Sequence, residues 1–473
     1  MFRNLKARVF MSSFPVVFFL TSLPAFPTPS AGQGQSPFLG SVPTGKAAGT
    51  PLELSLKEAF DRALKYNLGV IEADQGTRVA RAARLRTLNA LLPNLAGRVS
   101  GTVQQVNLRA LGINLQVPGV RIPSVIGPFS VADARAYLSQ EIFNWSDVKN
   151  LKSSSESEKA SQYTYKSDRD LVVLTTGSAY LLVISDGANV DSIRAQVKTA
   201  QTLYLQDVDQ NKQGVIASID VLRAKVELQT QQQRLIAAEN QLAIDKLALA
   251  RVIGLPNGQE FQLTDSVPYS ALGGIALEQA LQQAYTTRPD YLSARAQVRA
   301  AQLTRQSAAA ENYPFLSMET NYGDIGSPNF GTSHGTFTFS TTLNIPIFQG
   351  SRVRADKLQA EAALEQRKAE LEDLSGKIDD QVRTAFFNLK SSSELVTVAE
   401  SNIDLANQTL TQAEDRLSAG VADNLEVVQA QESVASATQS YIASLYEYNL
   451  AKISLAQAIG IAEQSALQYL GVR

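Results

Sequence analysis

The chain contains no cysteine and only one histidine, His334, among its 473 residues. The missing cysteine excludes a disulfide framework, a thiolate metal site and a lipidated cysteine. A single imidazole in the segment SPNFGTSHGT fits a solvated loop better than a metal site, so we expect no metal and no cofactor. No nucleophile–base–acid constellation and no phosphate-cradling glycine loop is visible, so we do not expect an enzyme.

The net charge is small, and aromatic residues and long apolar runs are scarce. The formal charge is −2, which gives no electrostatic footprint for nucleic acid. Aromatics make up 7% of the chain, and no proline follows Pro346. This composition favours long helices packed through small residues. Beyond the N-terminus no stretch approaches the roughly 18 apolar residues of a membrane-spanning helix.

The N-terminus has the pattern of an export signal. Arg3, Lys6 and Arg8 precede a short apolar segment, and small residues follow it. A membrane anchor is the alternative, but two prolines break the apolar segment and leave it short. We therefore predict a cleaved signal peptide over residues 1–31. Residues 32–53, rich in Pro, Gly and Ser, are predicted to be a flexible linker.

The rest of the chain is an internal duplication. Leu54–Asn67 resembles Ile275–Arg288, at an offset of 275 − 54 = 221 residues. Further along, Gly214 and Gly420 are related by 420 − 214 = 206 residues. The offset falls because the first copy carries a longer insertion in its strand unit. Such a nearly constant register is unusual by chance, so we predict two structural repeats.

Each copy shows the same order of a short helix, a second helix, two strands and two long helices. The first copy is predicted over 54–256, with strands at about 95–108 and 130–143 and a helical hairpin at about 146–254. The second is predicted over 275–462, with strands at about 315–323 and 335–347 and a hairpin at about 350–460. The remainder is predicted to be a linker at 257–274 and a C-terminal tail at 463–473.

The predicted strands alternate between apolar and polar residues. In the first, Leu95, Val99 and Val103 alternate with polar positions such as Arg98 and Ser100. Each strand is near the 9–11 residues that cross a bilayer when tilted. A small soluble sandwich would also alternate. If the strands do cross a membrane, four are too few to close a barrel, and open edges cannot lie in lipid, so the chain must oligomerise.

The long helices carry a sustained seven-residue period. A row of large residues runs beside a row of small ones, as in a coiled-coil seam. The large row is Val382, Leu389, Val396, Ile403, Leu410 and Leu417. One clear break, Gly420-Val421, interrupts this helical run, and Gly214-Val215 repeats it in the first copy. These breaks predict the tight ends of two helical hairpins.

The chain resembles the outer-membrane efflux factor family typified by TolC. The resemblance is carried by LSLKEAFDRALKYN and its repeat, by two strand pairs each leading into a long helix, and by QGVIASIDVLRAK and AGVADNLEVVQAQ. It implies a mixed fold: a long α-helical coiled-coil barrel, or tunnel, with a trimeric transmembrane β-barrel of four strands per protomer. It also implies a small equatorial domain around the tunnel.

The resemblance further implies a location and partners. The protein is expected in the outer membrane of a diderm bacterium, in contact with lipid and with a periplasmic tunnel. It is expected to be a homotrimer and a passive exit duct of a tripartite efflux or export system. A periplasmic adaptor (membrane fusion) protein and an inner-membrane transporter are the implied partners. The alternative is a soluble periplasmic coiled-coil scaffold or adaptor, which leaves the four strands unexplained.

Mapped on this resemblance, Asp220 and Glu426 occupy positions of acidic gate residues. Rings of like charge in a constriction attract cations. Compensation of a helix dipole, worth roughly 0.3–1 kcal/mol, is an equally good explanation. The chain departs from the pattern at Gln429, where a second acidic residue occurs in relatives, and at Ala422, where a basic one occurs. Gate closure by a network of ion pairs is therefore not expected from the sequence.

Two further sets of residues are assigned on the same grounds. The hairpin tips, expected to dock the adaptor, are Gly214, Val215, Gly420 and Val421. The barrel-rim aromatics, for which buried packing between barrel and tunnel is the alternative, are Phe143, Trp145 and Phe348.

Overall fold

The structure is a computed structural model, and the elements from Pro37 onward form one compact unit. The predicted signal peptide and Gly420 lie outside the residues it describes. The described residues are 36–113, 119, 123–266, 269–273, 276–327, 332–419, 421 and 424–471.

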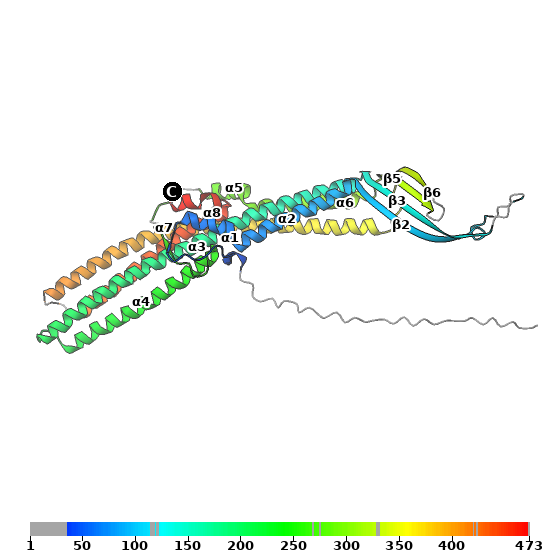
Figure 1. The fold of residues 1–473 in the computed structure, drawn as a ribbon. Coiled ribbons are helices and arrows are strands. Elements are labelled where there is room, and N and C mark those ends of the chain that lie inside the picture. The colour runs from blue at the N-terminus through cyan, green and yellow to red at the C-terminus, as the bar shows by residue number, and fades with distance from the viewer. Residues whose placement is uncertain are drawn as a thin grey trace, which may run out of the picture. The chain divides into compact units, whose positions relative to one another are not determined.

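The duplication predicted from the sequence is visible as two runs of elements in the same order (Figure 1). The first copy comprises α1 (Leu56–Tyr66), α2 (Leu68–Leu88), β2 (Asn94–Asn107), β3 (Val125–Phe143), α3 (Trp145–Lys212) and α4 (Ser218–Val252). The second comprises α5 (Leu277–Thr287), α6 (Pro289–Ala310), β5 (Phe315–Ser327), β6 (Thr332–Asn344), α7 (Arg352–Ser418) and α8 (Asn424–Ile459). The strands lie at one end of the long helices and the hairpin turns at the other.

The segments expected to be linkers contain regular structure in their described residues. The short 3-10 helix η1 (Pro37–Leu39) and strand β1 (Leu52–Leu54) lie in the first, and β4 (Phe261–Leu263) lies in the second. β1 pairs with β4 in parallel, and Leu54 and Phe261 are buried. The expectation of a flexible N-terminal linker was wrong because it weighed Pro, Gly and Ser content and overlooked Phe38, which packs against the buried hydrophobic core.

The C-terminal tail is also helical, as α9 (Ala462–Leu470). Ala462, Ala466 and Leu470 are buried at intervals of four residues, which places them on one face of the helix. The backbone N–H of Glu463 donates to the buried carboxylate of Asp170 on α3, at 2.9 Å. This contact and the apolar face anchor the segment that composition alone left as a tail.

One antiparallel sheet of four strands has the order β2-β3-β5-β6. β3 begins at Val125, earlier than the predicted 130, because a register shift between Gln104 and Val106 lets pairing with β2 continue. The two copies meet where β3 pairs with β5. Within the described residues, β2 and β6 have no strand partner on their outer edges, so the sheet is open on both sides.

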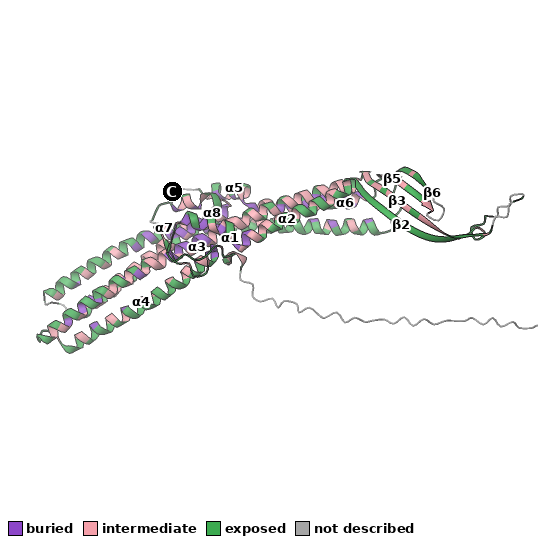
Figure 2. Cartoon of the chain, viewed as in Figure 1, coloured by how far each residue is buried: buried purple, intermediate pink, exposed green. Residues whose placement is uncertain are grey.

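The main core lies where α1, α3 and α8 meet, and Figure 2 shows buried residues concentrated there. Gly177 on α3 permits this close packing. A Cβ at that position would lie 2.6 Å from Ile453 Cδ1 of α8 and 3.4 Å from the Phe60 ring of α1. A second cluster joins α5, α7 and α8 around Ile378 and Val382. These clusters fix the long helices near their middle.

Helix α3 is long and apolar enough by composition to cross a membrane, which the sequence analysis did not anticipate. Its apolar residues include Val172, Val173 and Tyr180, each of which is buried in the main core. Packing within the unit therefore accounts for part of this apolar composition, since 39% of the apolar window is buried.

Candidate functional site

The four-stranded sheet has one apolar face and one polar face. Val99, Phe337 and Leu343 project from the apolar face and are 85%, 66% and 59% exposed. Strand register places Arg98 opposite Arg135 and Tyr137 opposite Asn321 on the other face. An exposed apolar face costs free energy in water but not in lipid. The apolar face of the sheet is therefore suited to contact with lipid, and the polar face to contact with water.

The helices that continue from the sheet are long. α3 has 68 residues and α7 has 67, so each is about 100 Å long at 1.5 Å per residue. Asn144 begins α3 as an N-cap, because its side-chain oxygen accepts from the N–H of Ser146 at 3.0 Å. This cap joins strand and helix directly, so the sheet and the hairpin turns lie at opposite ends of the same continuous element.

The two hairpin turns have the same backbone bonding. Val215 N–H donates to Gln210 C=O at 2.9 Å, and Val421 N–H donates to Arg416 C=O at 3.0 Å. Both are the six-residue bond of a Schellman cap. Gly214 has φ +77°, a conformation that only glycine adopts without strain. Val215 and Val421 are 69% and 67% exposed, so each turn presents an apolar side chain to its surroundings.

Asp220 and Glu426 both lie in the first turn of a helix, α4 and α8 respectively. Each forms an ion pair with an arginine. Asp220 Oδ1 lies 3.2 Å from Arg223 Nη1, and Glu426 Oε1 lies 3.3 Å from Arg416 Nε. The second pair joins α7 to α8 across the turn. The acidic residues are thus partly neutralised, which the sequence reasoning did not foresee.

The two arginines were missed because they occupy different positions in the two copies. At the offset of 206 residues, Arg223 corresponds to 223 + 206 = 429, which is Gln429. Arg416 corresponds to 416 − 206 = 210, which is Gln210. Arg223 lies three residues from Asp220, a spacing at which helix side chains meet, whereas Arg416 lies across the turn from Glu426. Gln429 itself is exposed on α8, and its C=O accepts from Ser433 Oγ at 2.9 Å.

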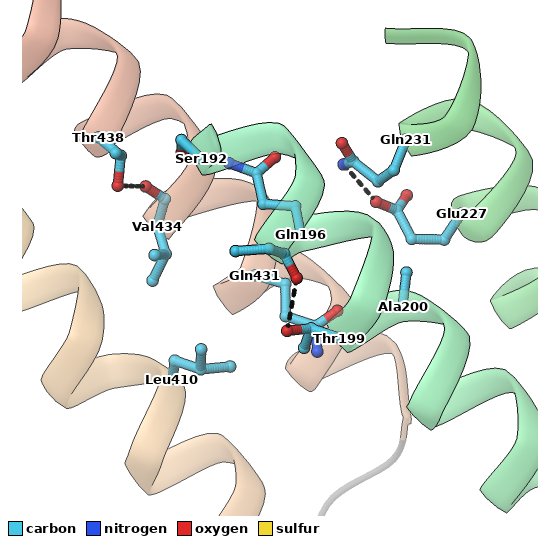
Figure 3. A pocket seen from close by; sticks show the side chains of 11 residues that line it. Ser192, Gln196, Thr199, Ala200, Glu227, Gln231, Leu410, Gln431, Val434 and Thr438 are labelled. Atoms are coloured by element: carbon cyan, nitrogen blue, oxygen red, sulfur yellow. Dashed lines mark hydrogen bonds between the residues drawn. The ribbon is translucent and has the colours of Figure 1, made fainter. Parts of the chain in front are cut away.

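Further up the helices, a cavity of about 220 Å³ lined by both polar and apolar side chains lies between the hairpin α3–α4 and the hairpin α7–α8 (Figure 3). Gln231 Nε2 donates to Glu227 Oε1 at 2.7 Å, and Gln231 is only 3% exposed. Nearby, Arg234 Nη2 lies 3.0 Å from Glu432 Oε1 and joins α4 to α8. Of these two contacts, only the Arg234–Glu432 ion pair joins the hairpins. An exposed ion pair exchanges readily for water, so separating the hairpins here costs less than opening an apolar seam.

The predicted rim aromatics lie at the junction of strands and helices. The rings of Phe143 and Trp145 are 6.1 Å apart, and Lys149 Nζ lies 4.9 Å from the Trp145 ring. Phe348 is 87% exposed. These side chains are not buried between sheet and helices of the same chain.

Several ionisable groups in the middle region have pKa values shifted by burial, Lys452 and Asp186 among them. Lys452 on α8 is fully buried, and burial lowers the pKa of its ammonium group to about 8. Burial and the neighbouring carboxylate of Asp245 raise the pKa of Asp186 to about 7. Across the described ranges, no three His, Cys, Asp or Glu side chains gather as metal ligands. We therefore assign neither group to a metal or catalytic site.

Strands with a lipid-facing side, joined to helices about 100 Å long, define the class of outer-membrane channels with a periplasmic extension. The chain belongs to the outer membrane efflux protein family, whose sequence profile matches residues 60–255 and 280–461. It is an outer-membrane component of an efflux or export system, and the alternative of a soluble periplasmic scaffold is wrong.

Individual relatives have low sequence identity to this chain, but the matches cover most of its length. The chain is 23% identical to outer membrane protein TolC of Escherichia coli over 72% of its own length and 71% of that protein. It is 24% identical to the pyoverdine export outer membrane protein OpmQ of Pseudomonas aeruginosa, over 90% and 88%. The fold matches the crystal structure of the CmeC outer membrane channel of Campylobacter jejuni with a TM-score of 0.72, at 17% identity, over 93% and 94% of the two chains.

Proposed function

We propose that three copies of this chain form one passive duct through the outer membrane. The observation that carries this proposal is the open four-stranded sheet with an apolar exposed face. Unpaired strand edges are not tolerated in lipid, so β2 of one copy would pair with β6 of the next. Three sheets would then close a barrel of twelve strands, and the long helices would continue it as a tunnel.

Light scattering and disulfide trapping test this assembly. We expect the protein extracted from membranes in detergent to have three times the chain mass. Because the chain has no cysteine, Ala96→Cys on β2 can be combined with single cysteines along β6. Oxidation should link neighbouring copies, whereas a cysteine on the interior strand β3 in place of the β2 cysteine should not. A monomer in detergent, or protein that stays in the aqueous fraction, would contradict the proposal.

The duct would receive cargo from an inner-membrane transporter through a periplasmic adaptor, after export directed by a cleaved signal at residues 1–31. The exposed Val215 and Val421 at the hairpin turns support an adaptor contact there. Both proteins should co-purify after crosslinking and be identified by mass spectrometry. Val215→Asp with Val421→Asp should lose the adaptor while the protein still inserts, and retention of the adaptor would exclude these tips as its contact.

The acidic residues of the first helical turns are proposed to act as a gate and selectivity filter. Asp220 and Glu426 are paired with arginine, so their loss would leave Arg223 and Arg416 as uncompensated positive charge. Phe143, Trp145 and Phe348 are proposed to lie at the membrane–water interface, as exposed aromatics do in barrels.

Neutralising the gate carboxylates should change the channel. For Asp220→Asn with Glu426→Gln, we expect higher conductance in planar bilayers and a cation preference lower by roughly twofold or more. Glu372→Gln, on an exposed part of α7, removes a carboxylate away from the turns and should change neither property. If the double variant has the conductance and selectivity of the unmodified protein, the residues serve only to compensate helix dipoles.

A further inference from the structure

Two arginines lie directly opposite each other on the polar face of the sheet. Arg98 on β2 pairs in register with Arg135 on β3. Like charges opposed across an antiparallel pair are destabilising. A neutral residue at position 98 would remove this repulsion, so the stability of the sheet does not explain why both charges are present.

Arg135 is held in place by its surroundings. Its Nε donates to Asp133 Oδ1 at 2.6 Å, and its Nη1 donates to Asn321 Oδ1 at 3.3 Å. On the neighbouring strand, Gly323 leaves room for it, because a Cβ there would lie 2.7 Å from the Arg135 Cα and 2.9 Å from its Cγ. The backbone and two polar partners therefore fix this guanidinium on the polar face.

Arg98 is exposed and is supported from one side. Its guanidinium lies 5.0 Å from the centre of the Tyr137 ring, which also lies 5.4 Å from the guanidinium of Arg135. Among the residues that the structure describes, no carboxylate lies within ion-pair distance of Arg98. Asp133 pairs with Arg135 and not with Arg98, so the two guanidinium groups and this one carboxylate leave an excess of one positive charge at this level of each chain.

Beyond Asp133, the next acidic residue along the polar face does not cancel this excess positive charge. Glu319 pairs with Ser139, four residues along β3 from Arg135. At about 3.3 Å per residue, this is about 13 Å away. That distance exceeds the Debye length of about 10 Å at 0.1 M salt, so the two levels are electrostatically distinct.

We propose that Arg98 and Arg135 form an anion-binding ring inside the barrel, which selects cargo or ions bearing carboxylate or phosphate groups. This inference rests on the proposed threefold duct, in which the polar face lines the lumen. Three chains would place six arginines and three aspartates at one level. Planar guanidinium groups match the geometry of carboxylate and phosphate oxygens, and rings of arginine are typical of anion-selective pores.

The test uses single channels in planar bilayers at low salt, where screening is weakest. Under a potassium chloride gradient, Arg98→Gln should lower the ratio of chloride to potassium permeability by roughly twofold or more, and Arg98→Lys should restore most of it. Arg78→Gln, which removes an exposed arginine from α2, is the matched control and should leave the ratio unchanged.

Pyrophosphate provides a second measurement that does not depend on a variant folding. Added to the strand-loop side of the unmodified channel, it should block the current in a voltage-dependent manner. Arg98→Gln should weaken this block, and Arg98→Lys should keep it. An unmodified channel that pyrophosphate does not block, or an unchanged permeability ratio in Arg98→Gln, would overturn the ring. If the unmodified protein conducts no current at all, the proposed duct fails, and the ring fails with it.

Discussion

Val99→Arg is expected to abolish insertion of the sheet into the membrane. Val99 lies near the middle of β2 on the apolar face and is 85% exposed in the single chain. An arginine on the lipid face near the bilayer midplane costs about 2–4 kcal/mol. In a threefold barrel this cost would act three times on one assembly. Outer-membrane fractions should contain little of the variant, and planar bilayers should show few channels.

Ser100→Arg is the matched control, one residue further along the same strand. Ser100 points to the polar face and pairs in register with Asp133, so a new arginine there meets water and a carboxylate. This variant should reach the outer membrane at close to the normal amount. Equal insertion of the two variants would contradict the assignment of the apolar face to lipid.

Lys452→Met is expected to stabilise the folded chain at pH 7 by about 3 kcal/mol, from a pKa lowered from 10.5 to about 8. Lys452 is fully buried on α8, and its Nζ has no hydrogen-bond partner among the described residues. The ammonium group also contacts the Tyr448 ring, with Nζ 4.5 Å from the ring centre. Methionine fills a similar volume without a charge to desolvate.

The effect has a defined pH dependence. The pKa of Lys452 is lower in the folded chain than in the unfolded chain, so the unfolded state binds more protons between about pH 8 and 10.5. The stability of the unmodified protein should therefore rise with pH across this window. Lys452→Met should remove that rise, because the burial penalty that deprotonation relieves is absent.

Urea unfolding in detergent, followed by far-ultraviolet circular dichroism, measures both effects. Lys390→Met, at an exposed position on α7, is the control and should leave the midpoint within experimental error. A lower midpoint for Lys452→Met at pH 7 would show that the ammonium group makes a favourable interaction that outweighs its desolvation.

The charges near the hairpin turns show where sequence reasoning stopped. The family resemblance located Asp220 and Glu426, and both lie six residues after the glycine of their turn. It did not find Arg416, because the partner of Glu426 comes from the opposite side of the turn. Arg223 is three residues from Asp220 and was within reach of helical spacing rules. Contacts across a turn need its geometry, whereas contacts along one helix do not.

The amino-acid sequence was enough to predict the duplication, the two-faced strands, the helical hairpins and their turns. These features follow from local periodicities of two and seven residues and from glycine, all of which are set by backbone geometry. Four features became visible only in the folded chain. β1 pairs with β4, α9 packs on α3, Lys452 is buried, and Arg98 lies opposite Arg135. Each of these features depends on contacts between segments that are far apart in the sequence. Such contacts set burial and strand register, and neither can be read from one segment alone.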